Sequence, residues 1–193
     1  MSTKIAFNGI DNCGKTSIIN RVRGYLESEG VNCYVPGNLI TYSSLFPPTL
    51  EERSLWYQNA AGEEIIDAFI DAQYNREQDI SGKSGYVLLD RGKPTITSSC
   101  LARLLIRGDK KLYESLKNEE TKMESSIDVY LGFGDSYIGT IEKREGKRLE
   151  KSFRDYLSIF HNELDSRRDE MDILLNAEDS ININYTQLLQ SLR

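Results

Sequence analysis

The first candidate for chemistry is a glycine-rich segment close to the start of the sequence. Residues 9–16 read Gly-Ile-Asp-Asn-Cys-Gly-Lys-Thr and match the pattern G-x-x-x-x-G-K-[ST] at every fixed position. The backbone N–H groups of such a loop surround phosphate oxygens, and the N-terminus of the following helix adds its positive dipole end. The segment therefore predicts a phosphate-binding loop, in which Lys15 neutralises the β- and γ-phosphates of a nucleotide and Thr16 ligates Mg²⁺.

The residues on either side of this segment fit a loop between a strand and a helix. Residues 3–8 are rich in apolar side chains and predict a buried strand, and apolar residues with helical spacing follow from Ser17 onward. We assign the following residues to nucleotide binding: Gly9, Asn12, Cys13, Gly14, Lys15, Thr16 and Ser17.

The second candidate is the pair Asp90 and Arg91, at the end of the most clearly buried stretch of the chain. An acidic residue there can hold Mg²⁺ through water, or it can accept the proton of an attacking hydroxyl or phosphate. The neighbouring arginine can bind phosphate oxygens with both arms of its guanidinium. The alternative interpretation is an exposed salt bridge at the end of a strand.

The third candidate is a basic cluster at residues 143–148, which reads Lys-Arg-Glu-Gly-Lys-Arg. Phosphoryl transfer spreads negative charge over equatorial oxygens, and kinases close positive side chains over the donor to meet it. Arg144 and Arg148 are four residues apart, which places both on one face if the segment is helical. Taken alone, the cluster also fits an ordinary solvated run of charges.

Composition limits the class of protein. The chain has 193 residues and a formal net charge of -6, so we expect no nucleic-acid polymer as a partner, because a phosphate backbone binds to a basic face. No apolar run approaches the roughly 20 residues of a membrane span, and we expect neither a membrane partner nor a signal peptide. Three cysteines without metal-type spacing indicate reduced thiols in a cytoplasmic protein.

Strand and helix signals alternate along the chain, which predicts an α/β fold, in one domain over residues 1–193, with a parallel sheet and helices on both faces. A capping box at Thr49 predicts the start of a helix, and Asn184 with Gln187 is a candidate cap for the last helix. In such a sheet, ligands bind beyond the carboxyl ends of the strands. Further segments are predicted as strands at 31–35, 85–90, 127–131 and 172–176, and as a long helix at 62–79.

The order of these motifs resembles that of the thymidylate kinase family of nucleoside monophosphate kinases, over nearly the whole chain. The segment 7–16 is similar to that family's Phe-Glu-Gly-Ile-Asp-Gly-x-Gly-Lys-Thr, and residues 75–78 are similar to its Asn/Asp-Arg-x-x/Gln helix motif. Asp90 and Arg91 match its Asp-Arg-Tyr in part, and the basic cluster falls where its lid falls. Residues 149–164 resemble the helix after the lid, and residues 176–181 resemble its closing Asp-Ala-x-x-Ser-Ile.

The resemblance implies a P-loop kinase with a five-stranded parallel sheet and a short lid at about residues 135–150. It also implies transfer of the γ-phosphate of ATP, with Mg²⁺ held by Thr16 and Asp90, to a nucleoside monophosphate. Asp11 would contact the sugar hydroxyl of the acceptor, and Arg76 would hold the phosphate or the base edge of the acceptor. Arg91 would bridge the phosphates of the donor and the acceptor. The resemblance also implies that Gln78 lies in the acceptor site and that Ala177 lies near the adenine of the donor. Arg144 and Arg148 would supply the catalytic charge, because Asn12 and Cys13 in the phosphate loop are neutral.

The acceptor half of the sequence departs from the family pattern. The family's Arg-Glu-Pro-Gly after the second strand is Tyr-Val-Pro-Gly at residues 34–37, which removes a phosphate-binding arginine. Ala72 stands where the family has an aromatic residue that stacks on thymine, so Tyr74 or Trp56 are candidates to replace it. Gly92 stands in place of the tyrosine after Asp-Arg. Thymidylate itself is therefore poorly supported as the acceptor.

Three functions remain open at this stage. The first is an ATP-dependent nucleoside monophosphate kinase, and the second is a kinase of a nucleoside or another small hydroxylated metabolite, with Asp90 as the base. The third is a nucleotide-switched GTPase or binding module, which the absence of an Asn/Thr-Lys-x-Asp guanine-reading motif disfavours. The expected partner is a small-molecule acceptor, and both a monomer and a homodimer are open.

Overall fold

The computed structural model describes residues 2–118, 127–134 and 137–192. Five parallel strands form one sheet in the order β2-β3-β1-β4-β5. They are β1 (Ser2–Asn8), β2 (Cys33–Tyr34), β3 (Gly85–Asp90), β4 (Ile127–Gly132) and β5 (Ile173–Asn176). The register pairs Phe7 with Asp90 and Asn8 with Tyr130, so the carboxyl ends of β1, β3 and β4 lie at one edge of the sheet.

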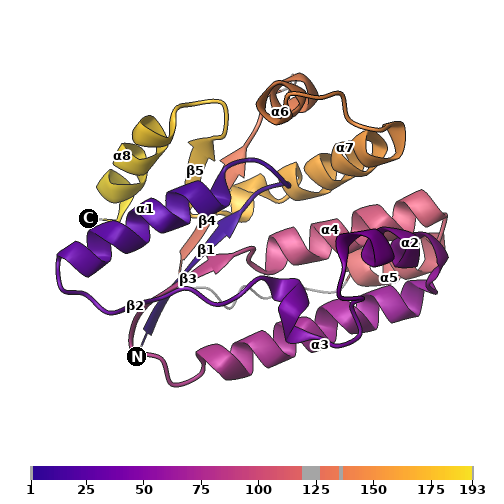
Figure 1. Ribbon diagram of the computed structural model, residues 1–193, viewed down its shortest axis with the longest axis horizontal. Coiled ribbons are helices and arrows are strands. Elements are labelled where there is room, and N and C mark those ends of the chain that lie inside the picture. The colour runs from indigo at the N-terminus through magenta and orange to yellow at the C-terminus, as the bar shows by residue number, and fades with distance from the viewer. Residues whose placement is uncertain (1, 119–126, 135–136, 193) are drawn as a thin grey trace.

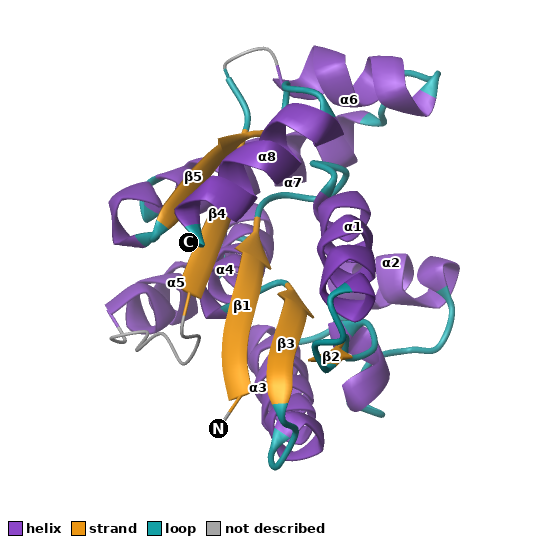
Figure 2. Cartoon of the chain, turned by 90° about the vertical axis from the view of Figure 1, so that its left-hand side faces the viewer, coloured by secondary structure: helices purple, strands orange, loops and turns teal. Residues whose placement is uncertain are grey.

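Helices cover both faces of this sheet, as the sequence predicts (Figures 1 and 2). The helices α1 and α8 lie on one face, and α3, α4 and α7 lie on the other. Helix bounds are α1 (Lys15–Ser28), α2 (Leu50–Asn59), α3 (Gly62–Ile80), α4 (Lys93–Arg107), α5 (Lys110–Asn118), α6 (Tyr137–Glu145), α7 (Lys151–Asp165) and α8 (Ile181–Ser191), with short 3₁₀ turns η1 (Leu39–Tyr42) and η2 (Arg168–Glu170). No helix within the described residues is both long and apolar enough to cross a membrane.

Most predicted segments are found where they are expected, with small changes at their ends. The Thr49 capping box is confirmed, because its hydroxyl accepts from the Glu52 N–H while the Glu52 carboxylate accepts from the Thr49 N–H. The second strand is shorter than predicted: β2 spans only Cys33–Tyr34, at the edge of the sheet, and the chain leaves the ladder before Pro36, which has no N–H to donate.

The predicted cap of the last helix is wrong. The Ser180 side chain caps α8 by accepting from the Ile183 N–H, one turn before Asn184. Asn184 lies inside the helix and is buried, and its amide donates to the Asn176 carbonyl at 2.7 Å. Asn184 therefore joins α8 to the end of β5 instead of starting the helix.

Candidate active site

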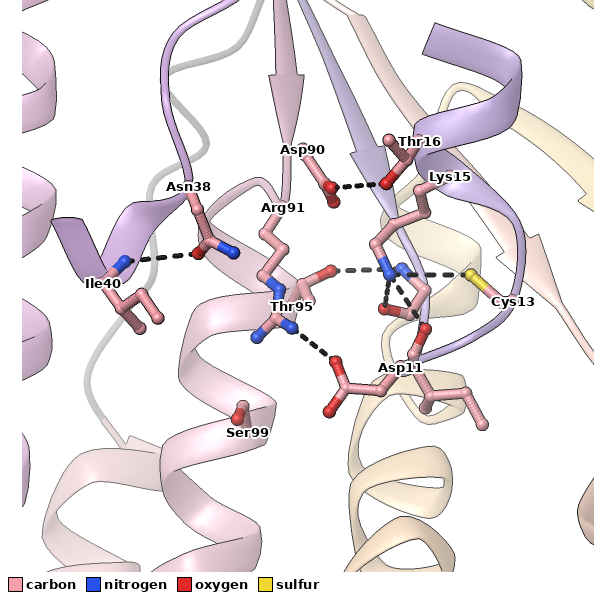
Figure 3. Close-up of polar contacts among 12 residues, drawn as sticks. Asp11, Cys13, Lys15, Thr16, Asn38, Ile40, Asp90, Arg91, Thr95 and Ser99 are labelled. Atoms are coloured by element: carbon pink, nitrogen blue, oxygen red, sulfur yellow. Dashed lines mark hydrogen bonds and ion pairs between the residues drawn. The ribbon is translucent and has the colours of Figure 1, made fainter. Parts of the chain in front are cut away.

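The glycine-rich segment forms a loop between β1 and α1, and its lysine is folded into it (Figure 3). The Lys15 Nζ donates to the carbonyls of Gly9 at 3.0 Å and Ile10 at 2.8 Å, and only 6% of the residue is exposed. Asn12 has a φ of 63°, a left-handed backbone that asparagine tolerates better than most residues. The charge of Lys15 is therefore held inside the curve of the loop, where a phosphate would bind.

The other residues assigned to the loop also lie in it. Cys13 is buried and its Sγ lies 3.6 Å from the Lys15 Nζ, while the Ser17 N–H donates to the Gly14 carbonyl in the first turn of α1. The Gly9 N–H donates to the Thr95 hydroxyl at 3.2 Å, which ties the start of the loop to α4.

Thr16 and Asp90 meet at the carboxyl edge of the sheet. The parallel pairing of β1 with β3 places Asp90 beside the phosphate loop, and the Thr16 hydroxyl donates to the Asp90 Oδ2 at 3.1 Å. The Asp90 Oδ1 is buried and has no hydrogen-bond partner among the described residues. A hydroxyl and a carboxylate with one oxygen unsatisfied are the hard oxygen donors that Mg²⁺ prefers, so these two residues fit the predicted metal site.

Arg91 is held in a specific conformation next to the loop. Its backbone has a φ of 81°, which is unusual for a residue with a side chain, and its guanidinium forms an ion pair with Asp11. Burial alone would raise the pKa of the Asp11 carboxyl, but the charges of Arg91, Lys15 and Arg103 together hold that pKa below its ordinary value. Asp11 is therefore ionised and forms an ion pair with Arg91.

Arg76 is buried and bound to the backbone of Arg91. It is 1% exposed, and its guanidinium donates to the Arg91 carbonyl at 3.0 Å and to the Gln73 Oε1 at 2.7 Å. Burial lowers the pKa of its guanidinium to about 10. In this structure Arg76 positions the backbone of Arg91, a contact different from the acceptor contact that the family resemblance implies.

A buried polar network explains why Gly92 follows the Asp-Arg pair. The Asn8 amide donates to the Asp128 Oδ1 at 2.7 Å, and its carbonyl accepts from the Thr95 hydroxyl at 2.9 Å. A Cβ at position 92 would lie 2.8 Å from the Asn8 Oδ1 and 3.0 Å from the Asp128 Oδ1. The tyrosine of the family pattern has no room here.

The two arginines of the basic cluster have different surroundings. The Arg144 guanidinium donates to the carbonyls of Ala177 at 2.5 Å and Asn12 at 3.3 Å, so it joins α6 to the two loops assigned to the donor. Arg148 is exposed and makes no hydrogen bond or ion pair with any described residue. The expected shared helical face is wrong, because α6 ends at Glu145 and Gly146 takes a φ of 67°, typical of a helix C-terminus.

Three residues proposed for the acceptor lie away from this group. Tyr74 is 60% exposed on α3, and Gln78 is exposed one turn further along. Trp56 packs with Phe46 and Tyr57 in a separate apolar cluster. Within the described residues, none of the three forms a hydrogen bond or ion pair with the loop, Asp90 or Arg91, so the structure brings none of them into the site.

Sequence analysis missed a polar group next to Arg91 and Asp11. It contains Arg103 and Ser99 from α4, Tyr57 from α2 and Tyr156 from α7. The Tyr156 and Ser99 hydroxyls are 2.8 Å apart, and the Arg103 guanidinium packs on both tyrosine rings. No motif marks these residues; only the i, i+4 spacing of Ser99 and Arg103 indicates that they share a face of one helix.

Comparison with known proteins supports the fold. No protein-family model matches the sequence, and no curated protein matches it. Among solved structures, the chain is similar to deoxyadenosine kinase from M. mycoides with bound dATP, at 13% identity and a TM-score of 0.66, over 98% of this chain and 99% of that one. The same enzyme with bound dCTP gives 13% identity and a TM-score of 0.63, over 98% of both chains.

The chain therefore has the α/β fold of P-loop kinases, with a five-stranded parallel sheet and flanking helices. The structural likeness is to deoxynucleoside kinases, and it does not single out the thymidylate kinase family to which the motifs pointed.

Proposed function

We propose that this protein is an ATP-dependent kinase that phosphorylates a hydroxyl group of an uncharged, nucleoside-like acceptor. The observation that carries the proposal is the contact between Thr16 and Asp90 at 3.1 Å, beside the buried amine of Lys15. It combines the phosphate loop, a fitting Mg²⁺ site and a carboxylate with one free oxygen in a single place.

Each residue then has a defined task. Lys15 and the loop N–H groups bind the β- and γ-phosphates of ATP, and Thr16 and Asp90 hold Mg²⁺, which neutralises phosphate charge when bound. The acceptor hydroxyl attacks the γ-phosphorus, the bond from that phosphorus to the bridging oxygen of ADP breaks, and Asp90 takes the hydroxyl proton. Arg91 stabilises the charge that develops on the transferred group.

Charge pairing on the acceptor side favours a nucleoside over a nucleoside monophosphate. An acceptor phosphate needs a further cation, but Arg91 is assigned to the transferred group and paired with Asp11, and Arg76 is bound to protein oxygens. The structural likeness to deoxyadenosine kinase agrees with this choice. Deoxynucleosides and ribonucleosides are accordingly the first acceptors to test.

An acceptor screen tests the proposal. Purified protein, ATP and Mg²⁺ are incubated with nucleosides and with the matching monophosphates, and the products are identified by mass spectrometry. We expect nucleosides to be phosphorylated, and we expect Lys15→Ala to lower turnover by about a hundredfold or more, since it removes a charge on the transferring phosphate. Absence of any acceptor-dependent ADP release would contradict the kinase assignment. A preference for monophosphates would show that the acceptor is a nucleoside monophosphate and not a nucleoside.

A further inference from the structure

Arg103 lies half-buried on α4, between the rings of two tyrosines from other helices. Its guanidinium carbon lies 3.3 Å from the ring centroid of Tyr57 and 4.4 Å from that of Tyr156. Its Nε is buried without a partner, and its guanidinium makes no hydrogen bond or ion pair with any described residue. The two Nη groups of this half-buried arginine are not used by the described part of the protein, so they are available to donate to a ligand.

The position of Arg103 connects it to the proposed site. Helix α4 begins two residues after Arg91, and Arg103 lies ten residues beyond its first residue, or about 15 Å along the axis. Ser99, one turn earlier on the same helix, lies near the Arg91–Asp11 pair in Figure 3 and contacts the Tyr156 hydroxyl. Ser99 and Arg103 are four residues apart and share one face of α4, which runs from the Arg91–Asp11 pair toward Tyr57 and Tyr156.

Electrostatics agree with this placement. Burial raises the pKa of the Tyr156 phenol to about 12, and the charge of Arg103 is the strongest influence opposing that rise. Burial also raises the pKa of Tyr57, opposed first by Arg103 and then by Arg91. Arg103 therefore acts on the same groups as the Arg91–Asp11 pair, and lies within reach of an acceptor bound there.

We infer that Arg103 is a specificity-determining residue that binds a carbonyl-bearing edge of the acceptor base. The inference rests on the proposed function, and it names the part of the acceptor that faces away from the phosphorylated hydroxyl. Both tyrosine rings pack on the guanidinium, so its N–H groups are what remain for a ligand. These are donors only, and they fit two neighbouring acceptor atoms such as O6 and N7 of a 6-oxopurine.

A 6-aminopurine presents a donor where a 6-oxopurine presents an acceptor, and the two bases otherwise have the same shape. Facing Arg103, the amino group would leave one of the two donors unsatisfied, because only N7 could still accept. A good bidentate arginine–base contact discriminates by about tenfold or more against the wrong base. The inference therefore predicts a preference for 6-oxopurine nucleosides over 6-aminopurine nucleosides.

Calorimetric titration without ATP tests binding independently of phosphoryl transfer. Inosine and adenosine form the matched ligand pair, and emission from Trp56, the single tryptophan, gives a local report because its ring lies 5.0 Å from that of Tyr57. We expect wild type to bind inosine about tenfold more tightly, and Arg103→Lys and Arg103→Met to lose this preference while adenosine affinity changes less than about threefold.

Arg21→Lys is the matched control. The Arg21 guanidinium also packs on a tyrosine ring, 4.9 Å from the centroid of Tyr185, but it lies on α1, on the opposite face of the sheet from α4 (Figure 1), so its replacement should leave nucleoside selectivity unchanged. Urea unfolding of every variant verifies that it is folded.

The inference is overturned if wild type binds neither nucleoside, shows no preference, prefers adenosine, or keeps its preference in the folded Arg103 variants. Selective binding without phosphoryl transfer would instead contradict only the proposed kinase activity. Transfer to both nucleosides without Arg103-dependent discrimination would contradict only this inference.

Discussion

Replacing Arg76 with methionine separates a positioning role from acceptor binding. Burial lowers the pKa of the Arg76 guanidinium to about 10, and a tenfold change in proton affinity is worth about 1.4 kcal/mol, so burying the charge costs about 3 kcal/mol. Its two shorter hydrogen bonds, to the Arg91 carbonyl and to Gln73, return about 1.5–3 kcal/mol each. Methionine fills most of the same volume, so the free energy of unfolding should fall by no more than about 3 kcal/mol.

The larger effect should be on turnover. The left-handed backbone of Arg91 costs about 1–3 kcal/mol, and its anchored carbonyl helps to hold that conformation. Without Arg76 the Arg91 side chain loses its fixed position, and we expect kcat to fall ten- to a hundredfold, which corresponds to about 1.4–2.7 kcal/mol. KM for the acceptor should change little, because Arg76 does not contact it.

Urea unfolding and steady-state kinetics with the best acceptor measure the two effects. Arg53→Met is the matched control: Arg53 also donates to two backbone carbonyls, those of Pro47 and Pro48, and in the described structure it forms no hydrogen bond or ion pair with Lys15, Asp90 or Arg91. It should alter stability alone. An Arg76→Met enzyme with unchanged kcat and a KM raised tenfold or more would refute the positioning role and support direct acceptor binding.

Three further predictions follow from the site. Asp90→Asn keeps the shape but removes the charge at the predicted Mg²⁺ site, so turnover should collapse while ATP still binds in an equilibrium binding assay; full activity would make Asp90 a strand-end contact only. Arg144→Ala should lower kcat about tenfold or more with little change in acceptor KM, while Arg148→Ala, which loses no contact, should be near wild type in steady-state kinetics. Nearby cations hold the pKa of Asp11 in the folded protein below its value in the unfolded chain, so Asp11 stabilises the fold fully at neutral pH. This stabilisation is lost as the pH falls from about 4 through the lower pKa of the folded state. Urea titrations across this range should show a weaker acid dependence of stability for Asp11→Asn than for wild type, and identical profiles would count against the ion pair.

The donor half could be predicted from sequence because its parts are local. Residues 9–16 form one continuous loop, and the parallel register brings Asp90 to it once β1 and β3 are recognised. The basic cluster was harder, because the end of α6 at Glu145 depends on a glycine whose conformation the spacing did not reveal. One of the two predicted lid arginines therefore reaches the donor loops, and the other does not.

The proposed acceptor half is assembled from residues far apart in the chain. Tyr57, Arg103 and Tyr156 come from three helices, and only the packing of α2, α4 and α7 brings them together. Each looks like an ordinary core or surface residue in its own segment. Arg76 shows the opposite error: its local motif fits the family, but burial directs its guanidinium to the backbone of Arg91.

The departures from the thymidylate kinase pattern at positions 8 and 92 form a single structural feature. The family's glutamate at position 8 would face the buried carboxylate of Asp128, and two ionised carboxylates at hydrogen-bond distance repel each other strongly in a low-dielectric interior. Asparagine provides instead an amide donor for Asp128 and a carbonyl acceptor for Thr95, whose hydroxyl accepts from the N–H that starts the phosphate loop. Gly92 leaves the space this network occupies. The two substitutions are thus coupled through Asp128. Together they hold the first residue of the phosphate loop through Thr95, by contacts that differ from the family pattern.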